Sequence, residues 1–272
     1  MNDHWTFLYS GLDKSSEIRA SQGVGILLNQ DMLSAWRRAG ELCEYRSARL
    51  LRIRLFIRNR YVPVVSCYAP TYTHAEVEKE RFYTELGQVL DQIPSRDELV
   101  ILGDFNARVG TNAQEQFTLG DTGIRAPVGR FGLPEVNDNG VRLLDFLATR
   151  DKDGLRVLST CFRHSTYGTW FHPSSRKWFQ LDHVICSERT AGLVTDVKVM
   201  PGYVHNTDHR CLKVQIRFPP KKALGNHFAR RDNPRPSRIP RLQVQLLQDE
   251  EVRARFLESF FNIGAEGLVN DS

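Results

Sequence analysis

Leu99-Val-Ile-Leu-Gly-Asp-Phe-Asn-Ala-Arg-Val-Gly110 is the segment from which we interpret the rest of the chain. Its first four apolar residues predict a buried strand, and Gly103 is expected to break that strand. Because side chains alternate along an extended chain, Asp104 and Asn106 are expected to point the same way, with Phe105 toward the core. Ligands of α/β proteins usually bind just beyond the carboxyl ends of strands. The alternative is an ordinary Gly-Asp turn with Asn106 in the left-handed conformation.

Polar residues also stand at the ends of three other predicted strands. One short apolar strand ends at Tyr68, and another begins at Asp182. A third follows Asp208 and His209, and its apolar residues alternate with polar and charged ones. Each has an ordinary explanation by itself, since an Asp-His pair beside a strand is often a hydrogen-bonded turn. Four such strand ends in one chain favour a shared site over unrelated turns.

Six motifs together resemble the endonuclease/exonuclease/phosphatase superfamily, over roughly residues 5–218. Four of them carry the polar residues named above, and two resemble the branch of retrotransposon endonucleases and craniofacial development protein 2-like proteins. The motifs are Cys67–Pro70, Gly103–Ala107, Leu181–Ile185 and Thr207–His209, with Asn137–Phe146 and Thr166–Trp170 for the branch. The resemblance implies an α/β fold built as a two-sheet, four-layer α/β sandwich.

The resemblance also implies catalytic roles in phosphodiester hydrolysis. Asp104 would orient or deprotonate the attacking water, and Asn106 would hold the phosphate or a metal ion. His209 would contact the phosphate, with its ring oriented by Asp182. Tyr68 would donate to the phosphate or support the pocket.

The cofactor implied by the resemblance is Mg²⁺ or Mn²⁺, because both ions prefer hard oxygen ligands. Asp104, Asn106 and Asp208 are the candidate ligands. The family pattern adds an Asn at the end of its first strand and a metal-binding Glu at the end of the next. We expect neither residue here, because both would precede the strand predicted at Trp5, and Glu17 lies in a polar loop. An amino-terminally truncated fold with weakened metal affinity is therefore expected.

The implied function is that of a metal-dependent, endonuclease-like phosphodiesterase that acts on DNA and derives from a retrotransposon endonuclease. Its products would carry 3′-hydroxyl and 5′-phosphate ends, and its activity is expected to be weak or lost. One alternative is a non-catalytic nucleic-acid-binding or interaction protein with the same fold. Another is a phosphatase or phospholipid phosphodiesterase of the same superfamily. No small-molecule cofactor is expected.

Candidate contacts to nucleic acid include one aromatic and several basic side chains. The aromatic residue could stack on a base, although aromatics beside strands more often lie in the core. The paired basic residues resemble a weak nuclear address, and a solvated linker explains them equally well. The candidates are Arg108, Trp170, Lys221, Lys222, Arg230 and Arg231.

Composition divides the chain into three predicted parts. Residues 1–218 form the endonuclease/exonuclease/phosphatase-like domain, 219–241 a basic Pro/Arg-rich linker, and 242–272 an amphipathic helix and tail. The linker carries seven Lys/Arg and one Asp, a charge of +6, so the remainder carries −1 of the net charge of +5. The basic excess therefore belongs to the linker rather than to the predicted catalytic domain.

The overall composition is that of a globular protein. With 272 residues, of which 41% are hydrophobic, the chain can form one large domain and an extension. No apolar run approaches the ~18 residues of a membrane span, and no signal region is expected at the start. The five cysteines are widely spaced, and three lie in apolar strand-like runs, which favours core thiols over disulfides. We therefore expect an intracellular protein, nuclear rather than cytoplasmic, while the oligomeric state stays open.

Overall fold

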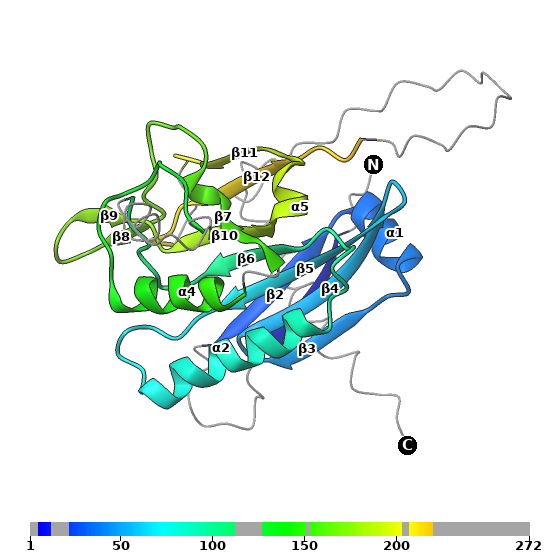
Figure 1. Ribbon diagram of the computed structural model, residues 1–272, viewed down its shortest axis with the longest axis horizontal. Helices are drawn as coiled ribbons and strands as arrows, with labels where there is room; N and C mark the ends of the chain where they lie inside the picture. Colours follow the sequence, from blue (N-terminus) through cyan, green and yellow to red (C-terminus); the bar gives the residue numbers. More distant parts are fainter. Residues whose placement is uncertain (1–4, 12–21, 112–126, 151–152, 203–206, 220–272) are drawn as a thin grey trace, which may run out of the picture. The chain divides into compact units, whose positions relative to one another are not determined.

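A six-stranded sheet forms the centre of the computed structural model, which describes residues 5–11, 22–111, 127–150, 153–202 and 207–219. Within the sheet, β5 and β6 run parallel, and every other neighbouring pair is antiparallel (Figure 1). The strands, in spatial order, are β3 (Cys43–Ser47), β4 (Leu50–Ile57), β5 (Arg60–Tyr68), β6 (Val100–Asp104), β10 (Asp182–Ser187) and β7 (Leu155–Val157).

The pairing register of the central strands brings predicted polar residues together. In the parallel pair β5–β6, Tyr68 is in register with Asp104, and in the antiparallel pair β6–β10, Asp104 faces Asp182. A parallel pair requires a crossover connection, which here contains α2 (Glu76–Asp91). The ends of β5 and β6 and the start of β10 therefore lie at one edge of the sheet.

Helices α2 and α4 (Asp138–Thr149) cover one face of this sheet (Figure 1). The side chain of Asn137 caps α4 by accepting a hydrogen bond from the Gly140 N–H. Apolar residues from both helices pack against alternate residues of the strands, and each fully buried Leu, Ile or Phe contributes roughly 1.5–3 kcal/mol. This core includes Leu50, Val65, Phe82, Leu86, Ile101, Phe105, Leu143 and Ile185.

Shorter elements cover the opposite face. They form two antiparallel ladders, β1 (Thr6–Gly11) with β2 (Gly23–Leu28), and β11 (Val194–Val199) with β12 (Leu212–Ile216). Within the described ranges the two ladders are separate sheets. The remaining elements on this face are α1 (Gln30–Arg38), α5 (Glu188–Ala191) and the 3₁₀ turn η2 (Leu158–Thr160). The core here includes Leu28, Leu33, Ile53, Val62, Val184, Cys186, Val194 and Val197.

A further hairpin consists of β8 (Trp170–His172) and β9 (Lys177–Phe179). On its other side, β8 pairs with the segment that carries His209, through an antiparallel bridge between Trp170 and His209. The hairpin therefore lies beside the segment that carries His209.

Gly103 allows the backbones of β5 and β6 to approach closely. Its φ is +155°, and a Cβ at this position would lie 1.9 Å from the carbonyl oxygen of Cys67. We predict that Gly103→Ala lowers the free energy of unfolding by about 3 kcal/mol, because the paired strands must separate to admit the methyl group. Gly202→Ala is the control, since a Cβ there would meet nothing within 4 Å. Urea unfolding measures both, and equal effects of the two substitutions would contradict this account.

The predicted α/β class is confirmed by the central sheet and its helices. The expectation that Gly103 breaks the strand is wrong, because β6 continues through it to Asp104.

Cys67 and Cys186 are buried as expected, whereas Cys211 is exposed because it precedes β12. Within the described ranges, none of the helices has the length and apolar character needed to cross a membrane. The predicted linker beyond Pro219 and the predicted helix within 242–272 lie outside the described residues.

Candidate active site

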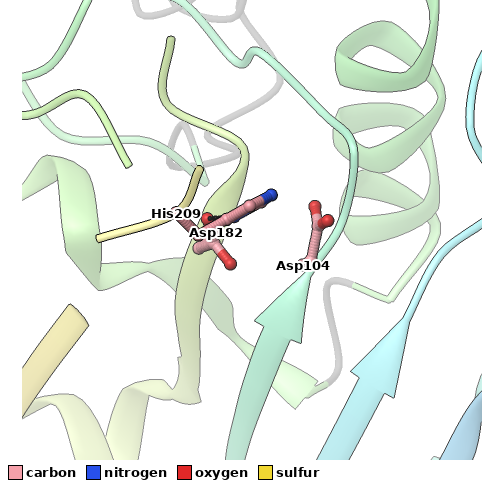
Figure 2. Close-up of side chains that lie close together, drawn as sticks. All are labelled: Asp104, Asp182 and His209. Carbon is pink, nitrogen blue, oxygen red and sulfur yellow. Dashed lines mark hydrogen bonds and ion pairs between the residues drawn. The ribbon is translucent and has the colours of Figure 1, made fainter. Parts of the chain in front are cut away.

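Three ionisable side chains meet at the edge of the central sheet. Figure 2 shows Asp104 at the end of β6, Asp182 at the start of β10, and His209 from the segment that leads into β12. One potential ligand atom from each residue lies within 4.8 Å of the other two. All three side chains are half-buried, so solvent reaches them while their mutual interactions are screened less than in water.

His209 and Asp182 form a hydrogen-bonded pair, with 3.0 Å between Nδ1 and Oδ2. Burial lowers the pKa of His209, but the hydrogen bond and charge of Asp182 outweigh it, with help from the charges of Asp104 and Asp208. The net result is a pKa above the usual value for histidine. Asp182 therefore favours the protonated ring and fixes its orientation, while Nε2 is presented away from Asp182.

Asp104 lies in an environment that favours its neutral form. Burial raises the pKa of Asp104 to about 7, and the charge of Asp182 adds to this effect. A hydrogen bond from the Asn106 N–H to Oδ1, 2.7 Å long, and the charge of His209 act in the opposite direction. The carboxyl group can therefore gain or lose a proton near neutral pH, as a general base must.

Asn106 adopts the left-handed conformation that was the alternative interpretation of this segment, with φ of +49°. Its side-chain amide nitrogen donates to the carbonyl of Ala69, 2.9 Å away, at the end of β5. Its carbonyl accepts hydrogen bonds from the side chains of Asn137 and Asn139. The same Asn139 side chain, only 3% exposed, also donates to the carbonyl of Pro70. Asn106 thus lies at the junction of three segments, and no local sequence pattern predicts a role for Asn137 or Asn139 at this junction.

Tyr68 ends β5 beside Asp104 and is half-buried. The guanidinium of Arg49 lies 5.2 Å from the centre of its ring and also donates to its carbonyl. Arg49 is also hydrogen-bonded to the ring of His74, so a buried cation packs against the Tyr68 ring. The role of Tyr68 in the pocket stays a prediction.

Trp170 and Asp208 contact each other next to the cluster. The indole Nε1–H of Trp170 donates to Oδ2 of Asp208 over 2.7 Å. Asp208 is exposed and contributes to the potential around Asp104 and His209, but the three-residue cluster excludes it. The side chain of Trp170 is half-buried, which is intermediate between an exposed residue that stacks on a base and a core residue.

Arg108 lies with its guanidinium 4.0 Å from the centre of the Phe179 ring. It therefore packs against the last residue of β9 in the β8–β9 hairpin. The other predicted nucleic-acid contacts, Lys221, Lys222, Arg230 and Arg231, lie outside the described residues, as does Glu17.

The donor set of the cluster fits a divalent cation. Two carboxylates face one another at the sheet edge, and their repulsion contributes to the raised pKa of Asp104. A cation between them would relieve this repulsion, and Mg²⁺ or Mn²⁺ would suit the oxygen ligands. Asp104 and Asp182 are the residues placed to hold it, while the predicted ligands Asn106 and Asp208 make the hydrogen bonds described above.

The fold is shared with enzymes that process DNA or phosphate esters. One is the endonuclease domain of TRAS1, a telomere-specific non-LTR retrotransposon, with 14% identity, a TM-score of 0.52, and 79% of this chain and 80% of that chain covered. Another is the 3′ phosphatase NExo from Neisseria bound to a product DNA hairpin, with 17% identity, a TM-score of 0.50 and the same two coverages. No family model matches the sequence. At these identities the likeness shows that the chain has the fold of these two enzymes.

A curated protein is more similar to this chain in sequence than these two structures are. The chain is 32% identical to craniofacial development protein 2 from Bos taurus over 198 residues. These residues make up 72% of this chain. The match spans 31% of that relative's length. The chain is therefore related to the craniofacial development protein 2 branch that the sequence motifs indicate.

Proposed function

We propose that the protein is a divalent-metal-dependent phosphodiesterase that cleaves DNA endonucleolytically. The observation that carries this proposal is the convergence of Asp104, Asp182 and His209 within 4.8 Å at the edge of the central sheet. The shared fold with the TRAS1 endonuclease domain and with a phosphatase that holds a DNA hairpin supports DNA as the substrate. The same likeness supports descent from a retrotransposon endonuclease, and a DNA substrate would place the protein in the nucleus.

The residues of the site divide the work of hydrolysis between them. Asp104, in its ionised form, takes a proton from water as the water oxygen attacks phosphorus. Protonated His209, held by Asp182, donates to a phosphate oxygen and stabilises the charge that develops there. The P–O3′ bond breaks, and the 3′-oxygen takes a proton from solvent. A Mg²⁺ or Mn²⁺ ion held by the carboxylates of Asp104 and Asp182 would neutralise part of the phosphate charge.

Three substrates offered side by side test the reaction class. The chain is incubated with Mg²⁺ and supercoiled plasmid DNA, a 3′-phosphate-ended DNA duplex, or phospholipid vesicles. We expect nicked circles whose new ends are 3′-hydroxyl and 5′-phosphate, as shown by extension with a polymerase and ligation without a kinase. Release of inorganic phosphate alone, or cleavage of lipid alone, would assign the site to a different member of the superfamily.

The binding-protein alternative makes a different prediction in the same tubes. A non-catalytic protein would shift DNA mobility without metal, with affinity falling steeply as salt rises, and would leave the plasmid closed. Metal-independent binding of intact plasmid, with no nicking at any Mg²⁺ or Mn²⁺ concentration, would therefore overturn the proposed enzyme activity.

A further inference from the structure

The motif Thr166–Trp170 has no part in the chemistry proposed above, yet one of its residues contacts both segments that form the His209–Asp182 pair. Thr169 is fully buried, with 0% of its surface exposed, immediately before β8. Full burial of a hydroxyl is costly unless the group is hydrogen-bonded. The bonds that it makes therefore indicate what the residue does.

The hydroxyl of Thr169 holds the segment that carries Asp182. Its Oγ1 accepts hydrogen bonds from the N–H of Leu181, over 3.0 Å, and from the N–H of Asp182 itself, over 3.1 Å. The neighbouring carbonyl of Leu181 accepts from the N–H of Phe105, next to Asp104. The hydroxyl thus fixes the backbone at the point where Asp182 leaves the turn and enters β10.

The backbone of Thr169 holds the segment that carries His209. Its carbonyl accepts from the N–H of Arg210 over 2.6 Å, and the next residue pairs with His209 in an antiparallel bridge. The N–H of Phe171 donates to the carbonyl of Asp208, which extends the same pairing by one more bond. Residues 169–171 therefore act as a short strand beside residues 208–210.

We propose that Thr169 is a positioning residue that sets the separation of Asp182 and His209 in the catalytic pair. One residue anchors both partners, with its side chain on the first and its main chain on the second. This inference rests on the proposed function, since it assigns a role in the reaction of the same site. It differs from a packing role, because packing needs the methyl group of Thr169 while positioning needs the hydroxyl oxygen.

Substitution at this position separates the two roles. Thr169→Val keeps the shape and removes the acceptor of two buried N–H groups, whereas Thr169→Ser keeps the acceptor and removes the methyl group. Thr160→Val is the matched control, because Thr160 is also 0% exposed and its hydroxyl also accepts a backbone N–H, from Gly129 over 2.7 Å. No hydrogen bond of the Thr160 side chain reaches Asp182 or His209 among those the described residues make.

The first readout is independent of catalysis. In ¹⁵N-histidine-labelled protein, the low-field ring N–H resonance that disappears in His209→Gln reports the hydrogen bond between His209 and Asp182. We expect this resonance to be lost or moved upfield in Thr169→Val and to remain in Thr169→Ser and Thr160→Val. An unchanged resonance in Thr169→Val would overturn the proposal, whether or not the wild-type chain cleaves DNA.

The second readout is steady-state kinetics on plasmid DNA. We expect Thr169→Val to lower kcat by about 10- to 100-fold with little change in KM, and Thr169→Ser to stay within about threefold of wild type. If Thr169→Val does not fold, Thr169→Ala against Thr169→Ser isolates the hydroxyl, and the same criteria apply. Equal kcat in the hydroxyl-bearing and hydroxyl-lacking variants would assign Thr169 to packing alone. A wild-type chain without nicking activity would refute the proposed function. The ring N–H resonance would still show whether the hydrogen bond between His209 and Asp182 depends on the Thr169 hydroxyl.

Discussion

His209→Ala lowers the rate of Mg²⁺-dependent DNA nicking by about 10²- to 10⁴-fold, the usual contribution of a positioned acid or base. The histidine is held by a 3.0 Å hydrogen bond to Asp182, and the hydrogen bond and charge of Asp182 raise its pKa. Its removal leaves the phosphate charge without this donor. Single-turnover nicking at saturating protein measures the effect without interference from product release.

A second histidine–aspartate pair supplies the control for that prediction. His164 Nε2 lies 2.8 Å from Asp196 Oδ1, with similar partial exposure, but the pair is outside the three-residue cluster. His164→Ala is expected to nick DNA at the wild-type rate. If His209→Ala and His164→Ala retained equal activity, the nicking would have to come from another site or a contaminating nuclease.

Asp104→Asn has the second large effect, and it acts in opposite directions on activity and stability. Activity is expected to fall by about 10³-fold or more, because the amide cannot accept the proton of water and is a poorer metal ligand. At pH values above 7 the variant is expected to be more stable than wild type, because the folded variant no longer has to hold an ionised carboxylate beside Asp182.

The pH dependence of this stabilisation follows from the direction of the pKa shift. A carboxyl whose pKa is raised from 3.8 to about 7 binds its proton more tightly in the folded state than in the unfolded state. Its contribution to stability is therefore full below about pH 4 and is lost as the pH rises to about 7. Asp104→Asn should match wild type near pH 4 and exceed it at pH 8 by on the order of 2 kcal/mol, since the amide also gives up the attraction to His209.

Urea unfolding at pH 4, 6 and 8 measures this difference. Asp97→Asn is the matched control, because Asp97 is 3% exposed and pairs with Arg54 at 2.9 Å. Loss of that ion pair should lower stability, so the two Asp→Asn substitutions are expected to have opposite signs at pH 8. An Asp104→Asn variant less stable than wild type at pH 8 would show that the carboxylate is not strained in the folded protein.

The parts of the fold that follow a simple hydrophobic pattern are predictable from the sequence. β6 is predicted by its apolar run, and β12 by apolar residues that alternate with Lys213, Gln215 and Arg217. Such a pattern does not predict α1 and β3, for physical reasons. α1 has only nine residues, and β3 is an edge strand whose residues, Cys43–Ser47, are mostly polar and are all partly or fully exposed.

The site is predictable only in part, because its hydrogen bonds join residues that are far apart in the sequence. Asp104, Asp182 and His209 stand at strand ends, and the register of β6 and β10 brings two of them face to face. The roles of Asn139 and Thr169 depend instead on hydrogen bonds to segments that are distant in the sequence, such as those at Pro70 and Asp182, which no local pattern encodes. The roles of the predicted ligands Asn106 and Asp208, by contrast, stay predictions.

Nicking of supercoiled plasmid as a function of Mg²⁺ concentration, by wild type and Asp104→Asn purified side by side, tests the central claim most directly. The claim is that Asp104, Asp182 and His209 form a metal-dependent phosphodiesterase centre. It predicts that wild-type nicking rises with Mg²⁺ to saturation, stops with EDTA, and is reduced by about 10³-fold in Asp104→Asn. Nicking that ignores Mg²⁺, or that proceeds equally in both proteins, would contradict it.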